Sequence, residues 1–190
     1  MIWLAWITAA VAADLTFVVV GDTQGSGTGD GVNMEVLPQL VEDMNVHAPD
    51  VALFPGGLVS GSEILADHVT QWEAFRTVAD GLVGEQMLLP GTSDLLPGDG
   101  TMEAWRETFA SLPVADSPEG EEGVSYYRDF GAVRLIALAS DQAVENQYKV
   151  SDGGLEWLDR VLTESESFEH VFVMTHHPVS FSDYPHDTVA

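Results

Sequence analysis

The sequence predicts an α/β fold in which parallel strands pair side by side and helices pack on the sheet. Two observations carry this prediction. Short apolar runs rich in β-branched residues are typical of strands buried on both faces, and the first of them are followed by a loop and a segment with helical spacing. This strand–loop–helix order is typical of parallel sheets. The length of 190 residues fits one domain with a substantial core, which we place at 14–190.

The first unit begins with residues 15–20 (LTFVVV), which predict a buried strand. A glycine-rich loop follows at 25–31, and it has no Lys or Arg nearby, so it indicates a turn rather than a phosphate-binding loop. A helix is predicted over 34–46, before Pro49, because apolar residues recur there at helical spacing. These apolar residues are Val36, Leu37, Leu40, Val41 and Met44.

The second unit repeats this order. Residues 51–54 predict a strand, and Ser62 is a candidate N-cap for the next helix. The apolar face of that helix would carry Ile64, Leu65, Val69, Trp72 and Phe75. Residues 87–89 predict a third strand that Pro90 closes.

The second half of the chain predicts a hairpin and a further strand–helix pair. Thr101 would cap a helix over 101–109, and residues 116–123 are acidic and rich in turn residues. The remaining elements are strands at 124–130 and 133–138, a helix capped by Ser151, and a last strand at 170–174. Trp72, Trp105 and Trp157 are expected in the core, and His47, His68 and His170 on the surface.

The charge balance limits the partners. The chain has 31 acidic and 6 basic residues, a net charge of −25. Such a surface repels nucleic acid and anionic membranes, and it repels a phosphate ester unless bound cations reverse the local field. Cysteine is absent, so thiolate metal sites are excluded.

Residues 1–13 (MIWLAWITAAVAA) are apolar and end in small residues. This pattern predicts a signal peptide with an A-x-A cleavage site at 10–12, and hence a secreted or periplasmic protein. The alternative is a first buried strand. The segment is too short to cross a bilayer as a helix.

Four polar blocks each follow a predicted strand, where an open α/β sheet collects its functional loops. The blocks are Asp22-Thr23-Gln24, Gly56-Gly57-Leu58-Val59, Gly91-Thr92-Ser93-Asp94 and His176-His177-Pro178. Their order resembles the calcineurin-like metallophosphoesterase family, whose blocks read Asp-x-His/Gln, Gly-Asp-Leu-Val, Gly-Asn-His-Asp/Glu and His-x-Pro. The likeness runs from about residue 15 to the last residue of the sequence.

The resemblance implies a four-layer αββα sandwich and a phosphoric ester hydrolase that uses two manganese, iron or zinc ions, with a phosphoester small molecule as substrate. Two such ions clamp the phosphate and activate a water. Carried over by position, Asp22, Gln24 and His176 match metal ligands. His177 would contact a ligand or the substrate, and Asp94 would support the catalytic histidine of its block.

Several positions depart from the family pattern. Gly57 stands where an aspartate would bridge both ions, Thr92 where an asparagine would bind, and Ser93 where the catalytic histidine would lie. No Gly-His-x-His block follows His176 within the sequence, so the sandwich is expected to be incomplete at its C-terminal side.

The departures predict lost or weak hydrolysis, with full occupancy by two ions in doubt. Two alternatives stay open. The chain is a non-catalytic binding or interaction module on the same scaffold, or it is an active enzyme. In that case the compensating ligands would come from Asp94, His177, Asp183, His186 or sequence beyond residue 190.

Overall fold

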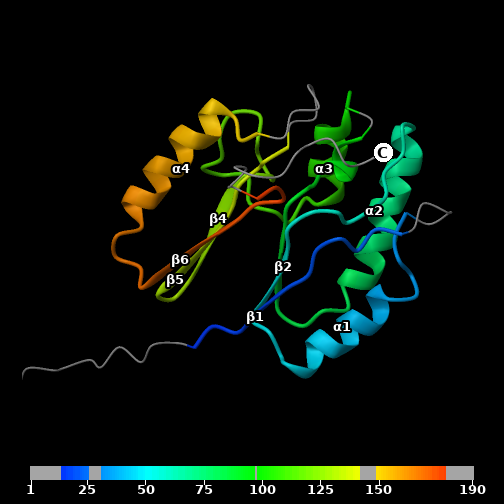
Figure 1. The fold of residues 1–190 in the computed structure, drawn as a ribbon, viewed down its shortest axis with the longest axis horizontal. Coiled ribbons are helices and arrows are strands. Elements are labelled where there is room, and N and C mark those ends of the chain that lie inside the picture. The colour runs from blue at the N-terminus through cyan, green and yellow to red at the C-terminus, as the bar shows by residue number, and fades with distance from the viewer. Residues whose placement is uncertain (1–13, 26–30, 97, 142–148, 179–190) are drawn as a thin grey trace, which may run out of the picture.

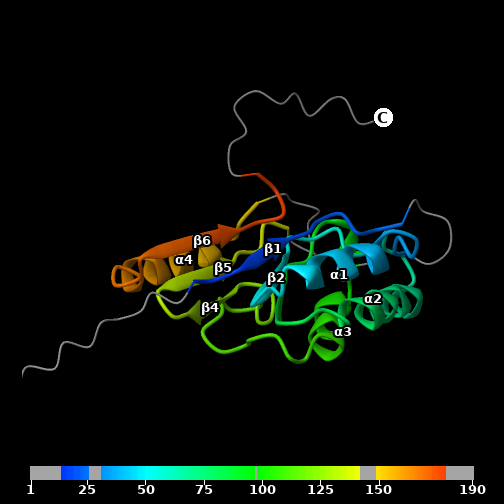
Figure 2. The same cartoon turned by 90° about the horizontal axis from the view of Figure 1, so that it is seen from below.

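Two three-stranded sheets form the centre of the molecule, and helices cover their outer faces. The computed structural model describes residues 14–25, 31–96, 98–141 and 149–178. Figure 1 shows α4 on one side of the molecule and α1, α2 and α3 on the other, with both sheets between them. The view turned by 90° keeps α4 beside β5 and β6 (Figure 2). The predicted αββα sandwich is therefore confirmed.

The first sheet is parallel and has the order β1-β2-β3. Its strands are β1 (Phe17–Val19), β2 (Val51–Phe54) and β3 (Glu85–Leu88). The crossovers between them contain α1 (Leu37–Val46) and α2 (Leu65–Ala79). Every residue of β2 is buried, as its continuous apolar run predicts for a central parallel strand.

The second sheet is mixed, with β5 in the centre, antiparallel to β4 and parallel to β6. Its elements are β4 (Tyr126–Phe130), β5 (Val133–Ala137) and β6 (His170–Met174), with α4 (Asp152–Glu164) between β5 and β6. Alternate residues of β5 face opposite ways: Leu135 packs into the core shared with the first sheet, and Ile136 packs with Trp157 of α4.

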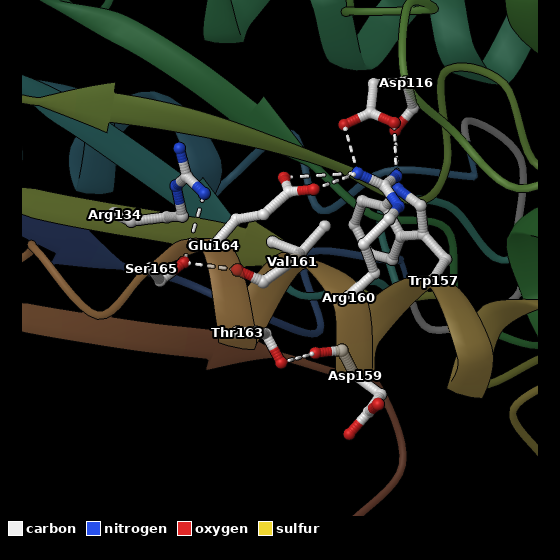
Figure 3. Close-up of polar contacts among 9 residues, drawn as sticks. All are labelled: Asp116, Arg134, Trp157, Asp159, Arg160, Val161, Thr163, Glu164 and Ser165. Atoms are coloured by element: carbon white, nitrogen blue, oxygen red, sulfur yellow. Dashed lines mark hydrogen bonds and ion pairs between the residues drawn. The ribbon is translucent and has the colours of Figure 1, made fainter.

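Contacts along α4 fix it against the second sheet and a neighbouring loop (Figure 3). Its N-cap forms as predicted, because the Ser151 hydroxyl accepts from the Gly154 N–H at 2.8 Å. Farther along, Trp157 Nε1 donates to the Asp116 carbonyl at 2.6 Å, and Arg160 pairs with the Asp116 carboxylate. These contacts hold the acidic loop that the sequence predicted over 116–123.

Element boundaries differ from the prediction where local hydrogen bonds compete. Ser62 does not cap α2, because its hydroxyl accepts from the Ile64 N–H at 3.1 Å. The helix begins at Leu65, and Ile64 takes the N-cap position. Thr101 is the first residue of α3 (Thr101–Thr108) rather than its cap, and its hydroxyl accepts from the Gly98 N–H. The third strand lies at 85–88 rather than 87–89.

The prediction for His68 is wrong, because this residue is fully buried. Its ring packs edge-on against Trp72, with centroids 4.4 Å apart. Nδ1 accepts from the Ser62 N–H at 3.1 Å, and Nε2 donates to the Asp94 carbonyl at 3.0 Å. Both ring nitrogens are satisfied in the neutral form, so the core tolerates this imidazole.

The predictions for the other two histidines and for three tryptophans are confirmed, whereas the strand predicted to be buried over 15–20 is only partly buried, with Val19 of β1 exposed. His47 and His170 are exposed, and Trp72, Trp105 and Trp157 are buried. The predicted signal segment at 1–13 lies outside the described residues. Within the ranges that the structure describes, no helix has the length and apolarity needed to span a bilayer.

The two long sides of the sandwich are closed differently. On one side, the Tyr126 hydroxyl of β4 accepts from the Leu88 N–H at 2.8 Å and donates to the Leu88 carbonyl at 2.9 Å. The hydroxyl thereby provides hydrogen-bond partners for two backbone groups at the edge of β3, which belongs to the other sheet. On the opposite side, Phe17 of β1 meets Phe172 of β6 edge to face at 5.3 Å, beside an apolar cavity of about 330 Å³.

Candidate metal centre

The loops after five strands meet at the carboxyl ends of the sheets, as α/β topology predicts. The loops after β1 and β2 are joined by the Asp22 N–H to the Gly56 carbonyl (3.2 Å) and by the Gln24 N–H to the Gly57 carbonyl (3.0 Å). The loop after β6 joins them through His176, whose Nδ1 lies 2.8 Å from the Pro55 carbonyl. The four polar blocks of the sequence therefore form one junction.

Asp94 holds this junction together from inside. Its side chain is fully buried, and its two oxygens accept from four backbone N–H groups. Oδ2 accepts from Gly57 (2.8 Å), Leu58 (3.1 Å) and Gly91 (2.8 Å), and Oδ1 accepts from Val59 (2.9 Å). The carboxylate thus binds two loops to each other and has no free face for an ion or a substrate.

Two buried groups here have shifted pKa values with opposite effects on stability. Burial raises the pKa of Asp94 to about 6, against the opposing effect of its N–H donors. The part of the stability that comes from proton uptake by Asp94 is therefore full below about pH 4 and is lost as the pH rises through 6, whereas its hydrogen bonds to the backbone are present in the ionised form. Burial lowers the pKa of His68, so its contribution is full above about pH 6.5 and is lost as the pH falls.

The raised pKa of Asp94 predicts that the Asp94→Asn variant has a different pH dependence of stability. Without the proton uptake of Asp94, the variant should lose more stability than the unsubstituted protein when the pH falls from 7 to 5. The difference should grow by about 1 kcal/mol over this range. Urea unfolding at pH 5, 6 and 7 measures it. Parallel pH curves for the two proteins would contradict the prediction.

Asp22 and Gln24, two of the predicted ligands, converge on Gly57. A Cβ atom added to Gly57 would lie 2.5 Å from Asp22 Oδ1 and 2.6 Å from Gln24 Oε1. Gln24 Oε1 is buried without a hydrogen-bond partner. Asp22 has a left-handed backbone (φ 55°), a conformation that concentrates at functional sites. These two oxygens therefore face the point where the family's bridging aspartate would begin.

His176 lies against two glycines, Gly56 and Gly91. A Cβ atom at Gly56 would lie 2.6 Å from His176 Nδ1, and one at Gly91 would lie 2.6 Å from His176 Nε2. Only glycine leaves room for the ring at both positions. Because the Pro55 carbonyl can only accept, Nδ1 carries the proton, and in the neutral ring Nε2 presents its lone pair.

His177 and Thr92 meet at Asp141, a residue that the sequence analysis missed. His177 Nε2 lies 2.9 Å from Asp141 Oδ1, and the Thr92 hydroxyl donates to the same oxygen at 2.8 Å. The signal that was available is the position of Asp141 just after β5, equivalent to the position of His176 after β6. Asp141, His176 and His177 offer ligand atoms that all lie within 4.8 Å of one another.

Ser93, at the position of the family's catalytic histidine, turns away from this role. Its hydroxyl donates to the Val59 carbonyl at 2.7 Å. The bond ties the 3₁₀ turn at Ser93–Leu95 to the loop after β2. Ser93 is therefore a structural contact between the same two loops that Asp94 joins.

The donor set does not fit a pair of ions that share a carboxylate. Asp22 and Gln24 offer two oxygens beside Gly57, and Asp141, His176 and His177 offer donors that cluster with one another. Gly57 supplies no oxygen between them. Among the described residues, Asp22 does not belong to the histidine cluster. The two sets of candidate ligands are therefore separate.

Comparisons with known proteins agree with this architecture. A dimetal phosphatase from Danio rerio has a similar fold, with a TM-score of 0.64 and 14% sequence identity over 87% of this chain and 70% of that chain. A search of curated proteins finds no match. Residues 15–190 match the sequence profile described as calcineurin-like phosphoesterase. With its motif order, its αββα sandwich and this match over most of its length, the chain belongs to the calcineurin-like phosphoesterase family, whose members use divalent metal ions.

Proposed function

We propose that this chain is a calcineurin-like phosphoesterase in which two-metal hydrolysis is lost or strongly reduced. The observation that carries the proposal is Gly57. A shared carboxylate holds two cations close together despite their repulsion, and glycine offers only hydrogen at this position. Asp94 cannot replace it, because both of its oxygens are bonded to backbone N–H groups.

The other substitutions add to this loss. A positioned acid or base contributes roughly 10²–10⁴-fold to the rate, and Ser93 can supply neither in place of a histidine. At the position of the family's metal-binding asparagine, the Thr92 hydroxyl donates its proton to Asp141 and does not replace the asparagine's amide oxygen as a ligand. A phosphoester small molecule remains the substrate class, and the charge of −25 makes its approach depend on bound cations.

The proposal is tested by hydrolysis of p-nitrophenyl phosphate with Mn²⁺ or Zn²⁺. We expect turnover far below about 1 s⁻¹, the lower end of the usual range for enzymes. The Asp22→Asn and Asp141→Asn variants are the controls for contaminating phosphatase, since trace activity from another protein would be unchanged by both. Turnover at enzyme-like rates that either substitution abolishes would overturn the proposal.

Restoring the carboxylate gives a second, separate prediction. Gly57→Asp should lower the free energy of unfolding in EDTA by about 1–2 kcal/mol, because φ is +68° and the new side chain meets Asp22. Saturating Mn²⁺ should recover at least this amount. Gly57→Asn has the same backbone strain without the charge and should gain much less. Equal Mn²⁺ effects on both variants, measured as shifts in Tm, would show that a carboxylate at residue 57 does not bind the ion.

A second candidate function is hydrolysis through compensating ligands. The position of Asp141 favours it, because a buried carboxylate lies beside His176 and His177. Asp183 and His186 lie outside the described residues. If this candidate holds, Asp141→Asn should abolish metal-dependent turnover while Asp22→Asn should not.

A further inference from the structure

We propose that Asp141, His176 and His177 form a binding site for one divalent transition-metal ion, independent of Asp22, Gln24 and Gly57. The site would replace the family's pair of ions by a single ion on the side of the second sheet. This assignment concerns binding, and it stands whether or not the chain hydrolyses phosphoesters.

The topology brings these residues together. β5 and β6 are parallel neighbours paired over five residues, from Val133↔His170 to Ala137↔Met174. Asp141 follows one strand and the two histidines follow the other, so the same sheet edge carries all three. A further bond supports the loop, because the His177 N–H donates to the Ser140 hydroxyl at 3.0 Å.

The environment of the Asp141 carboxylate is a second, independent observation in favour of an ion at this site. Only 5% of its side chain is exposed, yet Oδ2 has no hydrogen-bond partner. A buried carboxylate oxygen without a donor is costly, because carboxylates lose strong solvation on burial. The other oxygen is fully engaged with Thr92 and His177. An ion bound at Oδ2 would remove this deficit.

His176 is oriented as metal-binding histidines usually are. In such residues one ring nitrogen donates to a carbonyl or carboxylate, which fixes the ring and leaves the other nitrogen for the metal. Nδ1 of His176 donates to the Pro55 carbonyl at 2.8 Å, so Nε2 is the metal-binding atom. Gly56 and Gly91, which lie next to each other, leave room for the ring against the backbone.

The chemistry of the donors selects the class of ion. Two imidazoles and one carboxylate suit Zn²⁺, Co²⁺ and related transition metals better than Ca²⁺ or Mg²⁺. In a tetrahedral site with bonds of about 2.0–2.2 Å, ligand atoms lie about 3.3–3.6 Å apart, so a cluster within 4.8 Å must close by about 1 Å to bind an ion. Three protein ligands would leave coordination positions open for water or an anion.

The experiment is a Co²⁺ titration of the full chain in 0.5 M KCl, which screens weak binding to the acidic surface. The readouts are stoichiometry by equilibrium dialysis and the visible absorption of Co²⁺ bound to nitrogen ligands. We expect one ion per chain and displacement by Zn²⁺. Asp141→Asn and His177→Gln should each weaken binding more than about tenfold. Thr92→Val removes a hydroxyl that contacts both Asp141 Oδ1 and His177 Nε2 without being a ligand itself, and it should weaken binding less than either ligand substitution.

Matched controls separate this site from others. His170→Gln removes an exposed histidine of the same strand and should leave binding unchanged. Asp22→Asn should also leave the first ion bound, because Asp22 lies outside the cluster. Circular dichroism verifies the fold of each variant, and His177→Gln serves if Asp141→Asn does not fold. Two tightly bound ions, no bound ion, or binding lost in Asp22→Asn but kept in His177→Gln would each overturn the proposal.

Discussion

Replacing Asp94 by asparagine is expected to lower the free energy of unfolding at pH 7 by about 2–4 kcal/mol. An asparagine oxygen at the place of Oδ2 could still accept from Gly57, Leu58 and Gly91, but it lacks the charge that strengthens these bonds. Its amide NH₂ group would then face the Val59 N–H, so two donors would meet in a buried site. Urea unfolding monitored by tryptophan fluorescence measures the loss.

Two further variants make this expectation specific. Asp94→Ala leaves four buried N–H groups without an acceptor and should cost more than Asp94→Asn. Asp159→Asn removes an exposed carboxylate of α4 and should change stability by less than about 0.5 kcal/mol. If Asp94→Asn were as stable as Asp159→Asn, the assigned role of Asp94 would be wrong.

Removing the Tyr126 hydroxyl is expected to have the next largest effect, about 2–4 kcal/mol in Tyr126→Phe. The ring would stay in the core, but the buried N–H and carbonyl of Leu88 would both lose their partner. Each unsatisfied backbone group costs about 1–3 kcal/mol. No strand covers this edge of β3 among the described residues, so no other part of the sheet replaces the lost bonds. The midpoint of urea unfolding measures the change.

The control for Tyr126→Phe is Thr163→Val, which also removes one hydroxyl. The Thr163 hydroxyl donates to the Asp159 carbonyl at 2.9 Å on the exposed face of α4, where water can replace the bond, so this change should cost much less. Comparable losses in the two variants would show that the contact between β4 and β3 does not stabilise the sandwich as proposed.

The elements that sequence predicted best are those whose signal is local. The strands at 51–54 and 170–174 match β2 and β6 in full, because short apolar runs rich in β-branched residues favour strands, although only β2 is buried throughout and β6 is partly exposed. Ser151 caps α4 as predicted, because capping needs only neighbouring residues. The motif order indicated the αββα sandwich, and the meeting of the four polar blocks at one junction follows from it.

The predictions fail where the environment of a residue depends on residues that are distant in the sequence. His68 looked like a surface residue on a helix beside acids, but the Asp94 carbonyl, 26 positions away, accepts from its ring and makes burial possible. Asp141 was missed because its role depends on β5–β6 pairing, which places His177 beside it across 36 positions. A side chain's partners from another strand cannot be read from its own neighbourhood in the sequence.

The unequal lengths of β1 and β6 have a consequence for how the junction fluctuates. β1 pairs with β2 over only three residues at the edge of its sheet, whereas β6 pairs with β5 over five. Local opening should therefore release β1 first, because it breaks the fewest contacts. Such an opening would carry Asp22 and Gln24 away while the histidines and Asp141 keep their places, so the two halves of the junction would have different lifetimes.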